Sequence, residues 1–116
     1  VGVVSNHDTL RKLVERFDVP FAHVPHDRLD RDAHEAAVAE AIDAWAPAYV
    51  VLARYMRILS PDFVARYAGR LINIHHSFLP AFAGAAAYRQ AFARGVKLIG
   101  ATAHFVTTEL DAGPII

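Results

Sequence analysis

An uninterrupted apolar run, Tyr49-Val50-Val51-Leu52-Ala53, lies near the middle of the chain and has the length of a buried strand. A helix is predicted next, over residues 61–67, because Ser60 can cap the free amides at its start and Gly69 can end it. A second apolar segment, residues 71–75, follows and again has strand length. Strand, helix and strand in this order are typical of a parallel α/β sheet, in which we expect the first run to be fully buried.

Strand and helix patterns also alternate on both sides of this unit. The further predicted elements are strands over residues 1–4 and 21–24, helices over 10–17, 37–45 and 88–94, and a long extended segment over 96–107. Before the second of these helices lies a charged stretch that we expect to form a solvated helix start, comprising Arg28, Asp30, Arg31, Asp32 and Glu35. Strands that alternate with helices along the whole chain predict a mostly parallel α/β sheet.

The composition favours a single domain that binds a small molecule. The chain has 116 residues, of which 54% are hydrophobic, so it can bury a core but is too short for division into several domains. Its 12 basic and 12 acidic side chains balance one another, which gives no electrostatic basis for binding nucleic acid or an anionic membrane. Cysteine is absent, which excludes disulfides, thiolate zinc sites and a thiol nucleophile.

The two ends of the sequence predict a fragment of a longer protein, truncated at both ends. The chain begins without Met on the apolar run Val1-Gly2-Val3-Val4 and stops at Gly113-Pro114-Ile115-Ile116, where a strand would just be beginning. It contains no run of about 18 apolar residues that could span a bilayer and nothing that resembles a signal peptide. We therefore expect a cytoplasmic protein with no membrane partner.

Polar side chains end the second apolar segment. Period-two alternation places Asn73 and His75 on one face of the strand, while the opposite face carries Ile72, Ile74 and His76. Ligands gather at the carboxyl ends of parallel strands, where the amide of Asn73 can donate to a developing oxyanion and the imidazole of His75 can deliver a proton to a leaving nitrogen. The alternative is that both side chains only pair with local backbone groups, as buried polar groups usually do.

The last extended segment leads to a second group of polar residues. Alternation places Thr102, His104 and Val106 on one face, and the chain continues to Asp111 and Gly113. A carboxylate on a glycine-flanked loop beside a histidine is a plausible orienting pair. Asp-x-Gly is also ordinary turn chemistry, so the residues alone leave the role of Asp111 open.

A metal site is the other use that the 7 histidines suggest. Their spacing does not favour it, because His75 and His76 are expected to point to opposite faces and no helical His-Glu-x-x-His motif occurs. His23 and His26 lie in a polar segment, where we expect them to be solvated. The chain also lacks a glycine-rich phosphate-binding fingerprint.

Several separated motifs resemble the folate-dependent formyltransferase family. They are Met56-Arg57-Ile58-Leu59-Ser60, Asn73-Ile74-His75, Leu79-Pro80, His104-Phe105-Val106 and Leu110-Asp111-Ala112-Gly113. Two longer runs, residues 75–82 and 90–102, are similar to the formyltetrahydrofolate deformylase branch of that family, whose transferase relatives typically have Pro or Gly where His76 stands. The resemblance implies a Rossmann-like, mostly parallel sheet with helices on both faces.

The same resemblance implies a hydrolase of one-carbon metabolism and purine biosynthesis, which converts 10-formyltetrahydrofolate to formate and tetrahydrofolate. Asn73 would stabilise the oxyanion, and His75 would manage the proton of the departing N10. Asp111 would position His75 and the attacking water, while His104 would support the Asp111 loop. Water would be the nucleophile, with no metal and no cofactor beyond the folate substrate.

For the pterin ring of the substrate, the resemblance implies an apolar slot with few polar anchors. The residues carried onto this sequence are Met56, Arg57, Ile58, Leu59, Val106, Thr107 and Leu110. One departure from the family is the run Ala83-Gly84-Ala85-Ala86-Ala87-Tyr88, which has small residues at positions that are usually bulkier, polar or proline.

The resemblance extends along residues 1–116 as a partial catalytic domain. The complete protein is expected to carry an amino-terminal ACT-type domain and a further strand and helix before Val1, and to form a homo-oligomer. Two alternatives stay open. One is formyl transfer from the same donor to an amine such as glycinamide ribonucleotide, and the other is a non-catalytic folate-binding or regulatory module.

Overall fold

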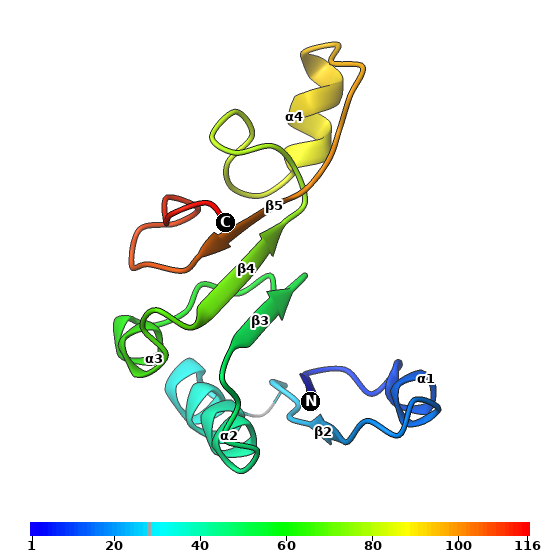
Figure 1. Cartoon of the computed structure of the whole chain (residues 1–116), viewed down its shortest axis with the longest axis vertical. Helices are drawn as coiled ribbons and strands as arrows, with labels where there is room; N and C mark the ends of the chain where they lie inside the picture. The colour runs from blue at the N-terminus through cyan, green and yellow to red at the C-terminus, as the bar shows by residue number, and fades with distance from the viewer. Residues whose placement is uncertain (28) are drawn as a thin grey trace. The chain divides into compact units, whose positions relative to one another are not determined.

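A computed structural model of the chain describes residues 1–27 and 29–116; Arg28, part of the predicted helix start, lies outside the described residues. Strands and helices alternate along the sequence, as the patterns predicted (Figure 1). The described residues form two compact units, residues 1–48 and residues 49–116. None of the helices that they form is long and apolar enough to cross a membrane.

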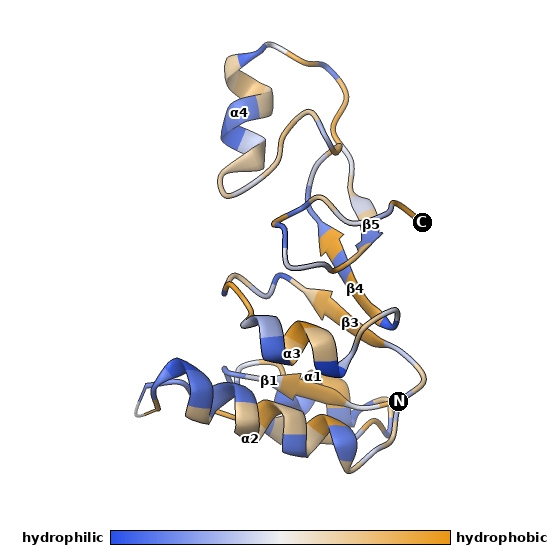
Figure 2. Cartoon of the chain, turned by 90° about the vertical axis from the view of Figure 1, so that its left-hand side faces the viewer, coloured by the Kyte–Doolittle hydropathy of each residue, from blue (hydrophilic) through white to orange (hydrophobic). Residues whose placement is uncertain are grey.

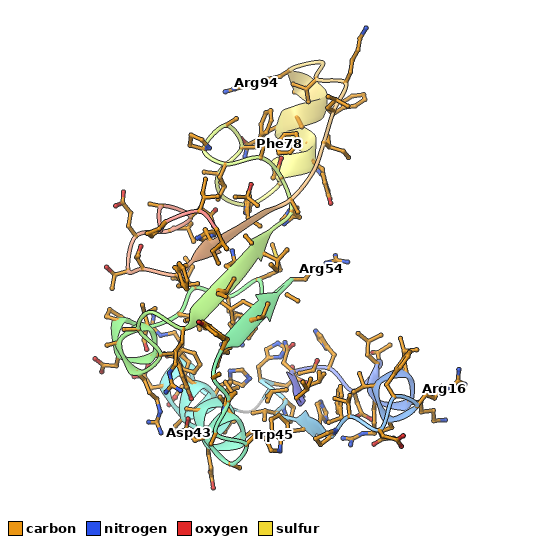
Figure 3. All side chains as sticks on the ribbon, in the orientation of Figure 1. Arg16, Asp43, Trp45, Arg54, Phe78 and Arg94 are labelled. Atoms are coloured by element: carbon orange, nitrogen blue, oxygen red, sulfur yellow. The ribbon has the colours of Figure 1, made fainter. Side chains whose placement is uncertain are left out.

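The first unit contains β1 Val3–Ser5, α1 Arg11–Glu15, β2 Phe21–His23 and α2 Arg31–Asp43. β1 and β2 are parallel neighbours. The side chain of Asp30 accepts a hydrogen bond from the amide of Ala33 at 2.8 Å, which caps the start of α2. Trp45, labelled in Figure 3, follows the end of α2. Its ring lies so close to Gly2 that a Cβ atom there would have no room.

One face of α2 is buried and includes two ionisable side chains. His34 is 1% exposed and Glu35 is 7% exposed, together with apolar residues that include Ala39 and Ile42. The expectation that Glu35 belongs to a solvated helix start is therefore wrong. Glu35 precedes Ala39 by about one helical turn and Ile42 by about two, so all three side chains lie on one side of the helix.

Three histidines gather in this unit, His7 after β1, His26 after β2 and His34 in α2. The rings of His7 and His26 meet edge to face with centroids 6.0 Å apart, and those of His26 and His34 do so at 6.4 Å. Asn6 Nδ2 lies 3.3 Å from His26 Nδ1. His23 is exposed, as expected, whereas His26 is half-buried rather than solvated because these neighbours cover it.

The second unit contains β3 Val50–Ala53, α3 Pro61–Arg66, β4 Leu71–His75, α4 Ala87–Ala93 and β5 Thr102–Phe105. β4 is the central strand of a three-stranded sheet (Figure 1). β3 is parallel to β4, and β5 is antiparallel to it. Because β1 and β2 are also parallel, the prediction of a mostly parallel arrangement is confirmed for the described strands.

Two predictions about the strands are wrong. Figure 2 shows β3 as hydrophobic along its length, but Val51 is 55% exposed and the strand alternates between half-buried and exposed residues, because successive side chains point to opposite faces. The long extended segment is also shorter than expected. β5 begins at Thr102, which pairs with His75, and β4 ends at His75, so residues 96–101 have no strand residue of β4 to pair with.

α3 begins at Pro61 as predicted and ends at Arg66, one residue before the predicted end. The side chain of Ser60 accepts a hydrogen bond from the amide of Phe63 at 3.2 Å. After the helix, Gly69 has a φ angle of +72°, a conformation that glycine adopts without strain. Tyr67 and Leu71, which lie on either side of Gly69 in the sequence, are 0% and 1% exposed. The connection from α3 to β4 therefore forms part of the core of the second unit.

Candidate active site

The pairing of β4 with β5 brings Asn73 and His104 together. The two residues are direct cross-strand partners, so their side chains lie on one face of the sheet. His104 Nδ1 lies 3.0 Å from the carbonyl oxygen of Phe105. A carbonyl oxygen can only accept, so Nδ1 carries the hydrogen, and in the neutral ring Nε2 is the acceptor. Asn73 Nδ2 donates to that Nε2 at 3.3 Å, which leaves its second hydrogen for another acceptor.

His75, at the end of β4, is also oriented by a carbonyl group. It is 4% exposed, and its Nε2 lies 2.8 Å from the carbonyl oxygen of Phe82. By the same reasoning Nε2 carries a hydrogen and is occupied as a donor. The other ring nitrogen, Nδ1, lies 3.6 Å from Asp111 Oδ2. Proton exchange by His75 must therefore occur at Nδ1, on the side that faces Asp111.

Asp111 lies between the two histidines, on the loop that follows β5. Its side chain is 7% exposed, and its Oδ1 lies 3.7 Å from His104 Nε2. Its Oδ2 accepts a hydrogen bond from the amide of Gly84 at 2.7 Å, a strong contact for a carboxylate. Asp111 itself has a φ angle of +54°, in the left-handed region.

The chain turns back toward β5 directly after Asp111. Gly113 passes the carbonyl group of Phe105 so closely that a Cβ atom would overlap it. The amide of Phe105 donates to the carbonyl oxygen of Pro114 at 2.9 Å, and Ile115 forms a bridge to His104. The residues alone left two roles open for Asp111, that of a turn residue and that of an orienting carboxylate. In this loop it has both.

These side chains line a cavity of about 320 Å³, a volume within the usual range for small-molecule sites. Asn73, His75, His104 and Asp111 are among the polar residues that line it. All the residues that the resemblance gave for folate binding also line it, namely Met56, Arg57, Ile58, Leu59, Val106, Thr107 and Leu110. Three of the apolar ones are unusually exposed, since Met56 is 67%, Ile58 71% and Leu110 63% exposed. An apolar ligand surface could cover them.

Several contributors to the site were missed in the sequence. The carbonyl of Phe82 and the amide of Gly84 are backbone groups, which no side-chain pattern identifies. Arg54 and Tyr55 also line the cavity, and Figure 3 shows the Arg54 side chain extending from the end of β3. Both directly follow the strand Val50–Ala53, so the rule that ligands gather at carboxyl ends of strands could have found them.

The prediction for His76 is wrong. It was expected on the face opposite His75, yet its ring lies 5.3 Å from the His75 ring and 5.1 Å from the Tyr88 ring, and it lines the same cavity. The reason is that β4 ends at His75, so the alternation of a strand no longer governs the next residue. Among residues 1–27 and 29–116, no group of three or more histidine, aspartate or glutamate side chains is arranged to hold a metal ion.

Comparison with known proteins agrees with this fold and site. The family described as formyl transferase matches residues 1–116, and the chain belongs to this family. It is 64% identical to the formyltetrahydrofolate deformylase of Escherichia coli strain K12 over 115 residues, which are 99% of this chain and 41% of that protein. The chain thus spans well under half the length of these curated relatives.

Solved structures lead to the same family. A formyltetrahydrofolate deformylase from Pseudomonas syringae pv. tomato has a TM-score of 0.90 and 56% identity, covering 99% of this chain and 39% of that one. Glycinamide ribonucleotide transformylase 1 from Symbiobacterium toebii has a TM-score of 0.91 and 39% identity, covering 100% of this chain and 56% of that one. The chain therefore has the α/β formyltransferase fold, which deformylases and transferases share.

Proposed function

We propose that this chain carries the catalytic centre of a formyltetrahydrofolate deformylase, which hydrolyses 10-formyltetrahydrofolate to formate and tetrahydrofolate. The observation that carries the proposal is the buried Asp111 carboxylate, 3.6 Å from His75 Nδ1 and 3.7 Å from His104 Nε2, in a cavity that also contains the Asn73 amide. The 64% identity to a protein of that name supports hydrolysis over transfer.

In the first step, water attacks the formyl carbon. The attacking water lies beside Asp111, which orients it, and beside His75 Nδ1, which accepts its proton. The carbonyl oxygen of the formyl group becomes an oxyanion, and the second amide hydrogen of Asn73 donates to it, because the first is used by His104. The substrate supplies the formyl group and water is the nucleophile, so the reaction needs no separate cofactor.

In the second step, the tetrahedral intermediate collapses and the bond from the formyl carbon to N10 breaks. N10 leaves as an amine and must gain a proton, which His75 delivers from Nδ1. Nε2 cannot serve, because it already donates to the carbonyl oxygen of Phe82. Asp111 stabilises the protonated form of the His75 ring and keeps Nδ1 in place.

The pterin ring of the folate lies in the apolar part of the cavity. Met56, Ile58 and Leu110, which line the cavity, supply exposed apolar surface, and backbone groups of the same segments can form hydrogen bonds with the polar edge of the ring. We further propose that the complete protein is cytoplasmic and acts as a homo-oligomer, as the resemblance implies.

A second candidate is formyl transfer to an amine, since the transformylase from Symbiobacterium toebii shares the fold at 39% identity. The two activities differ in what the site must admit next to the formyl carbon. A hydrolase admits water, whereas a transferase needs a pocket for its amine acceptor. A third candidate, a binding module without turnover, predicts folate binding alone.

The experiment that tests these candidates uses the complete protein with 10-formyltetrahydrofolate and no acceptor. We expect formate and tetrahydrofolate to be released in equal amounts, at a rate unchanged by added glycinamide ribonucleotide. Formyl transfer that requires the added amine would favour the second candidate. Folate binding in equilibrium dialysis without either product would favour the third. Either result would refute the proposal.

A further inference from the structure

The loop over residues 77–86 supplies two backbone groups to the site. The carbonyl oxygen of Phe82 accepts from His75 Nε2 at 2.8 Å, and the amide of Gly84 donates to Asp111 Oδ2 at 2.7 Å. One of these contacts selects the ring nitrogen at which His75 exchanges protons, and the other holds the carboxylate that faces it. The relative position of the two acid–base groups therefore depends on where this loop is held.

Gln90, on α4, holds the loop at the point where it meets Asp111. Its Nε2 donates to the carbonyl oxygen of Ala83 at 3.1 Å and to that of Ala85 at 3.2 Å. The carbonyl of Ala83 and the amide of Gly84 belong to one planar peptide group. This one rigid peptide group thus accepts a hydrogen bond from Gln90 through its oxygen and donates one to Asp111 through its nitrogen.

This peptide group needs an anchor because Gly84, which supplies its nitrogen, has a flexible backbone. Gly84 has a φ angle of +80°, and glycine occupies many backbone conformations at similar energy. Hydrogen bonds at both ends of one peptide also polarise it, so each strengthens the other. The two donations from Gln90 therefore restrict the rotation of the plane and strengthen the hydrogen bond to Asp111.

Other parts of the loop are held independently of Gln90. At its start, Thr102 Oγ1 accepts from the amide of Leu79 at 3.0 Å and donates to the carbonyl of Ser77 at 2.8 Å. Closer to α4, Phe82, Ala87 and Ala91 form a buried apolar cluster. Removing the Gln90 amide should consequently leave the loop folded and affect mainly the peptide that bonds Asp111.

We propose that Gln90 is a positioning residue for the reaction, acting through the Ala83–Gly84 peptide on Asp111. This inference rests on the proposed hydrolysis. When the Gln90 amide is lost, the Gly84 amide moves away from Oδ2 and the carboxylate loses its alignment with His75 Nδ1. The effect falls on kcat rather than KM, because the apolar cavity wall formed by Met56, Ile58 and Leu110 is not held by Gln90.

The first experiment compares substitutions in the complete protein. Gln90→Leu and Gln90→Glu keep the size but cannot donate to the two carbonyls, and we expect kcat to fall about 10- to 100-fold with KM changed less than about threefold. Gln90→Lys keeps a donor and should retain most of the activity. Arg89→Leu, on the same helix at an exposed position, is the matched control and should leave kcat unchanged. An unchanged kcat in Gln90→Leu, or equal losses in Gln90→Leu and Gln90→Lys, would overturn the proposal.

A double-mutant cycle tests whether the effect passes through Asp111. In an Asp111→Asn background we expect Gln90→Leu to lower the residual kcat by less than about threefold, since residues that act as one unit are not additive. If Gln90→Leu lowered kcat by the same factor of about 10 to 100 in both backgrounds, Gln90 would act on a group other than Asp111. This result would overturn the proposal.

A readout that needs no turnover separates this inference from the proposed function. The exchange of the Gly84 amide hydrogen should be at least about tenfold faster in Gln90→Leu than in the wild type or Gln90→Lys, because its hydrogen bond is weakened. Unchanged exchange would overturn the positioning role even in an active enzyme. Faster exchange in a protein that releases no formate would instead support the role of Gln90 and refute the proposed hydrolysis.

Discussion

Two asparagine–histidine pairs in this chain have the same separation in different surroundings. Asn73 Nδ2 lies 3.3 Å from His104 Nε2 in the second unit, and Asn6 Nδ2 lies 3.3 Å from His26 Nδ1 in the first. Asn73 lies within β4, and Asn6 follows β1 directly. The pair itself therefore does not distinguish a catalytic site from a structural contact.

The two pairs differ in the carboxylate that each histidine faces. Asp111 Oδ1 lies 3.7 Å from His104, and its side chain is 7% exposed. Asp27 Oδ1 lies closer to His26, at 3.3 Å, but its side chain is 79% exposed. Water screens the second contact and hardly reaches the first. The longer, buried contact thus belongs to a carboxylate that acts on its neighbours with little screening, and these include His75 Nδ1 at 3.6 Å, where the proton is exchanged.

The largest expected effect comes from removing the buried carboxylate. Asp111→Asn keeps the shape of the side chain and the hydrogen bond from Gly84, but removes the negative charge opposite His75 Nδ1. We expect kcat for formate release to fall by about 10³-fold, within the range for loss of acid–base and electrostatic catalysis.

Two measurements complete this test. Asp27→Asn removes the exposed carboxylate of the other pair and should leave kcat within about twofold of the wild type, because exposed ion pairs contribute little. Folate binding by Asp111→Asn, measured by fluorescence, should stay close to the wild-type value. A near-normal kcat in Asp111→Asn would show that the buried carboxylate has no role in proton transfer.

A smaller effect is expected from the asparagines themselves. Asn73→Ala removes the proposed oxyanion donor, and we expect kcat to fall by about 10²- to 10³-fold with little change in KM. Asn6→Ala removes the equally distant partner of His26 and should leave kcat unchanged. Steady-state assays of both variants make the comparison directly. Similar losses in the two variants would mean that the Asn73 amide only supports the fold.

The sequence predicted which side chains form the site better than it predicted the contacts between them. Alternation along β4 correctly placed Asn73 beside His75, and the extended segment of His104 was recognised although its pairing was not. Asp111 is different, because its partner Gly84 lies 27 residues away in the sequence. Periodicity describes neighbours along one element, so it cannot report a contact between two loops.

Backbone groups and loop ends explain what could not be predicted. The carbonyl of Phe82 orients His75, yet any residue at that position would offer the same carbonyl. His76 was misplaced because the end of a strand is uncertain by a residue or two in any pattern. Glu35 was misplaced for a different reason. Its charge suggested exposure, but a charged side chain can lie on the buried face of a helix when it has a partner.

The smallest expected effect on activity belongs to the first unit. His34 is 1% exposed, its Nε2 lies 3.1 Å from the carbonyl of Val24, and its Nδ1 is buried with no hydrogen-bond partner among the described residues. It therefore has the carbonyl anchor of a catalytic histidine, but within residues 1–27 and 29–116 no carboxylate forms an ion pair with it. His34→Ala should lower the free energy of unfolding by about 2–3 kcal/mol, since it leaves a cavity and an unpaired carbonyl group.

The kcat of folded His34→Ala should stay within about twofold of the wild type, because His34 is not among the residues that line the cavity. Urea unfolding gives the stability and formate release gives kcat, measured on the same preparation. His75→Ala, which removes another buried and carbonyl-anchored ring, should instead have its main effect on activity, with a large loss of kcat. If His34→Ala lowered kcat as much as His75→Ala does, a carbonyl anchor alone would suffice for function. The buried carboxylate would then not be the feature that separates the two regions.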